Sequence, residues 1–394
     1  MKKVYLDYAA TTPVRPEALE AMQPYWTEKF GNPSSIHNWG RKAREAVEKA
    51  REKIAFLIKA SPEEIIFTSS ITTSDNLAIF GTTNTLDSEH SHLITTQIEH
   101  HAVLDSFKEL EKRGFEVTYL PVDQNGLVQL DQLKKFLRPE TALISIMWAN
   151  NEVGTIEPLA EIIRIVKERN PETLFHTDAA TVIEYLPLDV KKLNVDLLSF
   201  GPHKFGGPKG IGILYVKNGA RISPFIFGGH QEKGFWPGTE AVPLIVGSAK
   251  ALELCVRDQE VNVKRVTKLR DRLIEGVLEK IPDTILTGDP VQRLPDIASF
   301  VFKGVEGEAI LLRLDAEGIA ASSGSACTSG ELKPSHVLLA MGISQEDAHG
   351  SIRFSLGRDT TEEEIDYVLE KLPKIIKDLR FLSSNLCLSA KENH

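Results

Sequence analysis

The sequence of 394 residues is poor in cysteine and has no excess of positive charge. Its three cysteines, Cys255, Cys327 and Cys387, are widely spaced, which excludes a disulfide framework and a paired-cysteine metal site. With 46 Lys and Arg against 55 Asp and Glu, the net charge of −9 argues against a nucleic-acid partner. No run approaches the roughly 18 consecutive apolar residues of a membrane helix, and Asp7 interrupts the N-terminus before a secretory signal could develop. We therefore expect a cytoplasmic protein without a membrane partner.

Short apolar runs and amphipathic segments alternate along most of the chain, which favours a mostly parallel sheet with helices on both faces. The expected helices are residues 16–29, 41–58, 103–113, 159–168, 242–256, 261–280 and 362–379. The expected strands are residues 65–67, 92–95, 116–120, 143–147, 174–176, 197–199, 211–216, 298–302, 319–321 and 351–354. Because the pattern changes after residue 258, we expect a large α/β domain over residues 15–258. Residues 1–14 and 259–394 would form a small α+β domain.

Lys204 lies in the segment SFGPHKFGGPKG, whose glycines and prolines favour a fixed, tight path between two strands. A lysine held in a rigid and partly buried loop is suited to form a Schiff base. The alternative is a solvated lysine on a surface turn.

Asp178 ends the apolar run FHTD, where α/β sheets place ligand contacts. Its carboxylate could hold a protonated pyridine nitrogen, or it could cap the next helix.

Residues 67–76, FTSSITTSDN, join a strand to a helix. Thr72 and Asp75 fit a capping box, and the amides of Ile71 and Thr72 would face an anion such as phosphate. An ordinary N-cap is the alternative.

Cys327 lies in SSGSACTSG, where the small neighbours offer no apolar core for it, so we interpret it as a reactive thiol. His100 and His101 follow a strand at the same expected sheet edge, where one could stack on a flat ring or transfer protons. Arg353, in the alternating strand SIRFS, could clamp a carboxylate or form a surface salt bridge. No histidine or cysteine belongs to a paired ligand motif, so we expect no metal bound by the protein alone.

In this order and spacing, the segments YLDYAATTPV, EHHAVLDS, SFGPHKFGGPKGIG, SSGSACTSGEL and SIRFSLGR resemble a NifS/IscS-type cysteine desulfurase. These are enzymes of the class V aminotransferase group that depend on pyridoxal 5′-phosphate (PLP). The resemblance implies fold type I of the PLP-dependent transferases, with a mostly parallel seven-stranded sheet in the large domain. It also implies a homodimer that converts L-cysteine to L-alanine and leaves a persulfide on Cys327.

The resemblance carries roles over to individual residues. It implies that Lys204 binds PLP covalently, Asp178 holds the ring nitrogen and His100 stacks on the ring as acid and base. The further cofactor contacts that it implies are Thr72, Asn151, His203 and, from the facing subunit, Thr239. Thr181 stands where the family has a cofactor contact, and the backbone amide of Ile71 is a further expected contact. Arg353 and Asn151 would bind the substrate carboxylate. Cys327 would pass sulfur to an iron–sulfur scaffold or another acceptor protein, where it could also ligate a transient cluster.

The chain departs from the family pattern at the cofactor site. Residues 69–73 read SSITT where the family has SGATE, Thr181 replaces a glutamine, Gly201 replaces a serine, and Trp236-Pro237 replaces Arg-Ser. These departures leave two alternatives open. One is another PLP reaction on the same scaffold, such as that of a selenocysteine lyase or an aminotransferase. The other is a non-catalytic homologue that binds a partner.

Overall fold

The computed structural model describes residues 2–88, 91–324 and 334–392. Its largest sheet has seven strands, in the spatial order β2-β8-β7-β6-β5-β3-β4. β8 is antiparallel to both neighbours and the other pairs are parallel, which confirms the mostly parallel seven-stranded sheet. The strands are β2 Ile65–Thr68, β3 His92–Thr96, β4 Glu116–Leu120, β5 Thr141–Ser145, β6 Leu174–Asp178, β7 Leu197–Phe200 and β8 Gly212–Val216.

Helices cover both faces of this sheet, because successive apolar residues of its strands point to opposite sides. In β2, Ile66 packs with α4 and α5, whereas Ile65 and Phe67 belong to the larger core on the opposite face. The helices of this part are α1 Pro16–Met22, α2 Pro24–Thr27, α3 Asn38–Ile58, α4 Ile71–Thr83, α5 His101–Lys112, α6 Leu130–Phe136, α7 Leu159–Arg169 and α8 Val190–Leu193. Short 3₁₀ helices among the described residues include Pro62–Glu64, Pro202–Lys204 and Gln231–Gly234.

Two smaller sheets lie beside the large one. β10 Ile297–Phe302 pairs antiparallel with β9 Thr284–Leu286 and β12 Ser351–Ser355, while β1 Val4–Tyr5 pairs parallel with β11 Ile319–Ala320. The remaining helices are α9 Val242–Lys280, α10 Gly307–Ala316, α11 His336–Ala340, α12 Gln345–Ala348 and α13 Glu362–Glu392. Within the described residues, no helix is long and apolar enough to cross a membrane.

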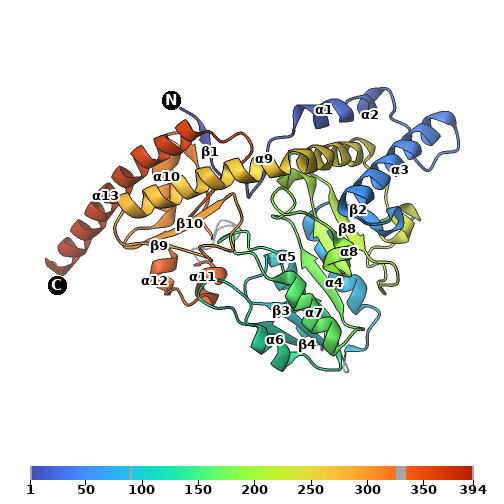
Figure 1. Ribbon diagram of the computed structural model, residues 1–394, viewed down its shortest axis with the longest axis horizontal. Coiled ribbons are helices and arrows are strands. Elements are labelled where there is room, and N and C mark those ends of the chain that lie inside the picture. The colour runs from blue at the N-terminus through green and yellow to red at the C-terminus, as the bar shows by residue number, and fades with distance from the viewer. Residues whose placement is uncertain (1, 89–90, 325–333, 393–394) are drawn as a thin grey trace.

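Helix α9 corrects the expectation of two separate helices over residues 242–256 and 261–280. It is a single helix of 39 residues that packs against α1 and α3 at one end and against β9, β10 and α13 at the other (Figure 1). Residues 257–260, RDQE, are polar but contain no glycine or proline, so nothing in them breaks the helix. By contrast, the single helix expected over residues 16–29 is divided into two helices, because α1 ends at Met22 and α2 begins at Pro24.

Candidate active site

A cavity of about 500 Å³ opens at the carboxyl edge of the large sheet, within the size range of small-molecule sites. Because β2, β3, β5, β6 and β7 run in the same direction, the segments that follow them meet at this edge. The expected site residues that line the cavity are Ile71, Thr72, His100, Asn151, Asp178, Thr181, His203, Lys204 and Arg353. The topology thus gathers residues that are up to 282 positions apart, from Ile71 to Arg353.

Lys204 ends a short 3₁₀ helix that follows β7. Its Nζ donates to the carbonyl oxygens of Ala9 at 2.5 Å and Ala10 at 3.1 Å. The lysine is therefore half-buried and held at the cavity by the N-terminal segment, which excludes the solvated surface turn as its setting.

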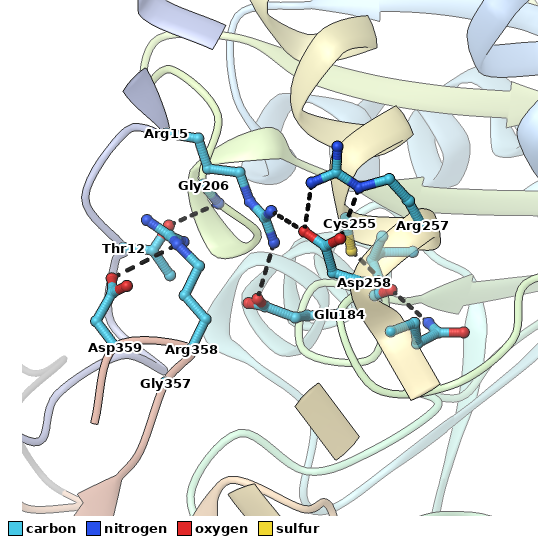
Figure 2. Close-up of polar contacts among 12 residues, drawn as sticks. Thr12, Arg15, Glu184, Gly206, Cys255, Arg257, Asp258, Gly357, Arg358 and Asp359 are labelled. Atoms are coloured by element: carbon cyan, nitrogen blue, oxygen red, sulfur yellow. Dashed lines mark hydrogen bonds and ion pairs between the residues drawn. The ribbon is translucent and has the colours of Figure 1, made fainter. Parts of the chain in front are cut away.

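The loop that carries Lys204 is fixed by the same segment. The N–H of Gly206 donates to Thr12 Oγ1 at 2.8 Å, and the N–H of Arg15 donates to the Gly206 carbonyl at 2.8 Å. The guanidinium of Arg15 then reaches α9, where Nη1 lies 2.7 Å from Asp258 Oδ2 (Figure 2). Its Nη2 lies 3.6 Å from Oε1 of Glu184, in the turn after β6. The loop is thereby tied to the longest helix of the molecule.

Asp178 is the last residue of β6 and is buried in the cavity wall. Its Oδ1 accepts a hydrogen bond from the Ala180 N–H at 2.8 Å. Burial raises the pKa of Asp178, while a protonated His100, the Ala180 N–H and Lys204 each favour its charged form. The carboxyl group lies in the cavity wall, where it could hold a protonated ring nitrogen. No helix begins directly after β6, because residues 180–185 form a turn, so Asp178 is not a helix cap.

His100 is the N-cap of α5, and its Nδ1 accepts from the Ala102 N–H at 3.1 Å. Burial lowers the pKa of His100, so the ring is neutral and its proton is on Nε2. His101 points elsewhere, since its ring packs against His336 with centroids 4.9 Å apart and it is not part of the cavity wall. The structure thus selects His100 from the pair.

The start of α4 corrects one sequence expectation. The N-cap is Ser70, which forms a capping box with Thr73, rather than Thr72 with Asp75. Thr73 N–H donates to Ser70 Oγ at 3.1 Å, and Ser70 N–H donates to Thr73 Oγ1 at 2.9 Å. This arrangement leaves the amides of Ile71 and Thr72 at the open first turn, where an anion is favoured by the helix dipole.

The departures from the family pattern have local explanations. A Cβ atom on Gly201 would lie 2.4 Å from Ile71 Cγ1, so the larger Ile71 occupies the space that a serine at 201 would need. The hydroxyl of Thr181 donates to the Ala149 carbonyl at 3.1 Å. His203 remains at the cavity, with Nδ1 3.4 Å from Thr11 Oγ1, and burial lowers its pKa to about 4.

Arg353, in the middle of β12, is brought to the cavity by the smaller antiparallel sheet. Its Nη1 donates to the Asn151 carbonyl at 2.8 Å and its Nη2 to Asp7 Oδ1 at 3.0 Å. Only 7 % of its side chain is exposed, which excludes a surface salt bridge. Asp7 is a cavity residue that sequence reasoning missed, although it lies in the quoted YLDYAATTPV segment.

One expected site residue, Thr239, lies away from the main cavity. Thr239 is exposed and lines a separate cavity of about 150 Å³, together with Trp236 and Pro237. Cys327 lies outside the described residues. Asp75 was considered only as a helix cap, yet it is a buried residue of the main cavity. The i, i+3 and i, i+4 spacing of Asp75 from Thr72 and Ile71 could have indicated that it shares their helix face.

Comparisons with known proteins agree with this architecture. The family described as Aminotransferase class-V matches residues 4–368. A protein named cysteine desulfurase IscS from Dictyoglomus turgidum is 53% identical over 97% of this chain and 96% of its own length. A protein of the same name from Methanosarcina thermophila is also 53% identical, over 97% of this chain and 94% of its own length.

Solved structures are similar as well. One described as a NifS-like protein has a TM-score of 0.91 and 42% identity, and the match covers 96% of this chain and all of the other. A second, a cysteine desulfurase from Thermococcus onnurineus NA1, has a TM-score of 0.86 and 25% identity over 96% and 95% of the two chains. The chain therefore belongs to the class V aminotransferase family, with the fold type I of its PLP-dependent members.

Proposed function

We propose that this protein is a PLP-dependent cysteine desulfurase that converts L-cysteine to L-alanine and transfers the sulfur to Cys327. The observation that carries the proposal is the meeting of Lys204, Asp178, His100 and Arg353 at one cavity. Each supplies a different function: an amine, a buried carboxyl group, a neutral imidazole and a guanidinium. Relatives that are about 50% identical and named cysteine desulfurase support the same assignment.

The residues present fit PLP. Lys204 supplies the amine that holds the cofactor covalently, and Asp178 supplies a carboxyl group for its ring nitrogen. The first turn of α4, with Thr72 and His203 nearby on the cavity wall, supplies N–H and side-chain donors for its phosphate. When bound, PLP stabilises negative charge that develops at the α-carbon of an amino acid.

The chain's own groups bind the substrate and move protons. Arg353 is held by Asp7 and the Asn151 carbonyl, which orients its guanidinium to bind the carboxylate of L-cysteine. His100, neutral and already hydrogen-bonded through Nδ1, holds its proton on Nε2. That proton can be donated to a group in the cavity and recovered later in the reaction.

Sulfur transfer is assigned to Cys327. Its thiolate attacks the sulfur of the bound cysteine, an S–S bond forms, the C–S bond breaks, and the carbon keeps the electron pair. Protonation of that carbon completes alanine, and the persulfide remains on Cys327. An iron–sulfur scaffold or another acceptor protein then takes the sulfur.

The surface supports a homodimer. The segment that follows α1 exposes large apolar side chains: Trp26 is 54% exposed, Phe30 66% and Ile36 87%. Such a concentration is typical of a protein–protein interface. Thr239 is exposed at the separate cavity, which suits a contribution to the site of a second copy.

The few, widely spaced cysteines support the cytoplasm as the compartment of this protein.

The test is the reaction of the purified protein with L-cysteine, with and without Cys327→Ser. We expect equimolar alanine and sulfide in the presence of a thiol reductant, and loss of both products in the variant. The visible absorbance of bound PLP should be the same in the two proteins. Keto-acid production would instead support an aminotransferase, and a protein that never takes up added PLP would support the non-catalytic homologue.

A further inference from the structure

Asp75, in the second turn of α4, is a completely buried carboxyl group in the wall of the main cavity. Neither of its oxygens makes a hydrogen bond of ordinary geometry among the described residues, and the Ser199 hydroxyl gives its anion only partial support. A carboxylate in such surroundings would have lost its hydration without receiving well-placed donors in exchange. The proposed reaction gives Asp75 no role, so its charge state needs an explanation.

The nearest basic group does not provide a compensating charge. His176 Nε2 lies 3.6 Å from Asp75 Oδ1, beyond hydrogen-bond distance. Its two ring nitrogens contact hydroxyl groups instead, Nδ1 with Ser145 Oγ at 2.8 Å and Nε2 with Ser199 Oγ at 3.0 Å. Complete burial lowers the pKa of His176 to about 3, so the ring is neutral at physiological pH.

Two further acids face Asp75 from neighbouring elements. Burial raises the pKa of Asp178 on β6 as well, but its anion accepts the Ala180 N–H at 2.8 Å and is favoured by Lys204. Glu99, in the turn before α5, accepts from Thr96 Oγ1 at 2.7 Å and from the Met147 N–H at 3.0 Å. Asp75 is therefore the acid of this group whose anion has the least support.

Electrostatic effects also favour the protonated form of Asp75. Burial raises the pKa of Asp75 well above its ordinary value, and the charges of Asp178 and Glu99 raise it further. The Ser199 hydroxyl opposes the shift, but burial is the larger effect. When two interacting carboxyl groups have different surroundings, the proton stays on the one that is poorer in donors.

We propose that Asp75 is a positioning residue that stays protonated, so that the negative charge facing the cofactor ring is located on Asp178 alone. The inference rests on the proposed function, because it concerns the residue that holds the ring nitrogen of PLP. A second anion beside Asp178 would compete for the same proton and make the charge at the ring depend on pH.

The test compares Asp75→Asn with Asp178→Asn in the PLP-loaded protein. Asparagine imitates a protonated aspartic acid in shape and charge. We expect Asp75→Asn to keep the PLP dissociation constant within about threefold of wild type, and Asp178→Asn to weaken binding by about tenfold or more. Asp75→Asn should also leave unchanged the pH at which the visible absorbance of bound PLP titrates.

Infrared difference spectra provide a readout that a merely structural role would not move. Bands of other buried acids, such as Glu157, occur in both proteins and cancel in the difference between them. The wild-type minus Asp75→Asn difference spectrum at neutral pH should therefore contain the carbonyl stretch of one buried, protonated carboxylic acid. Loss of PLP affinity in Asp75→Asn equal to that in Asp178→Asn, or an unchanged infrared band, would overturn the inference. A wild-type protein that does not bind PLP at all would overturn the proposed function instead.

Discussion

At the scale of single residues, Ile71 and Gly201 form a steric pair at the cofactor end of α4. The backbone of Gly201 has φ −150° and ψ 140°, which any residue can adopt, so only contacts limit what stands there. The limiting contact is the 2.4 Å approach of a Cβ atom to Ile71. The two departures from the family pattern therefore depend on each other.

This pairing predicts how the two positions respond to substitution. Gly201→Ser alone should lower the free energy of unfolding by about 1–3 kcal/mol, because the added atoms overpack against Ile71. In an Ile71→Ala background the same serine should fit, so the double variant should be more stable than the sum of the single effects by about 1 kcal/mol or more. Urea unfolding of the four proteins measures this coupling. Additivity within about 0.5 kcal/mol would show that Ile71 does not limit position 201.

At the scale of elements, the loop after β7 is fixed around Gly206. Its φ of +86° lies in the left-handed region, and a Cβ atom there would be 2.6 Å from Arg15 Cγ and 2.8 Å from Arg358 Nη1. Arg15 and Arg358 come from opposite ends of the chain, and both lie against this one glycine (Figure 2). The geometry of the Lys204 loop thus depends on both arginines.

Gly206→Ala should accordingly destabilise the protein by more than its backbone strain alone would. We expect it to destabilise the protein by about 2–4 kcal/mol and to reduce PLP retention, because it displaces the arginines as well as straining φ. Gly219→Ala is the matched control, since Gly219 has φ +94° but nothing within 4 Å of a new Cβ atom. Its expected cost is about 1 kcal/mol, with PLP retained. Thermal unfolding and dialysis against PLP-free buffer measure the two effects, and equal losses in both variants would contradict the role of the arginines.

At the scale of the whole molecule, buried acids outside the cavity make stability depend on pH. Glu157 is almost completely buried; its Oε2 accepts the Val128 N–H at 3.1 Å, and its Oε1 has no hydrogen-bond partner among the described residues. Burial raises the pKa of Glu157 to about 8, from an ordinary value of 4.5. Between these values the folded protein binds more protons than the unfolded chain, so stability falls as pH rises from 4.5 to 8.

Glu157→Gln should remove the contribution of this group. Glutamine keeps the oxygen that accepts from Val128 and cannot ionise, so the variant should lose less stability than wild type between pH 5 and pH 8. The expected difference at pH 8 is about 1–3 kcal/mol in favour of the variant. Urea unfolding at both pH values measures it. Glu161→Gln, on the half-exposed surface of α7, is the control and should leave the pH profile unchanged; a wild-type slope in Glu157→Gln would contradict the prediction.

Much of the fold followed from local patterns. The strands expected near residues 65–67 and 298–302 are present as β2 and β10, because runs of buried apolar residues leave few other conformations. The division of the chain at residues 15 and 258 stays a prediction, and residue 258 lies inside α9. The long helix was missed because a polar interval can interrupt an apolar pattern without interrupting a helix.

The sequence by itself determined the alternating elements, the seven strands and the set of reactive side chains, since periodicity and motif spacing are properties of neighbouring residues. Tertiary structure alone decided which of these side chains meet. It brought Asp7 to Arg353, packed His101 against His336, set Ile71 against Gly201 and buried Asp75 in the cavity wall. These outcomes depend on the packing of segments that are distant in the chain, and local patterns carry no information about such contacts.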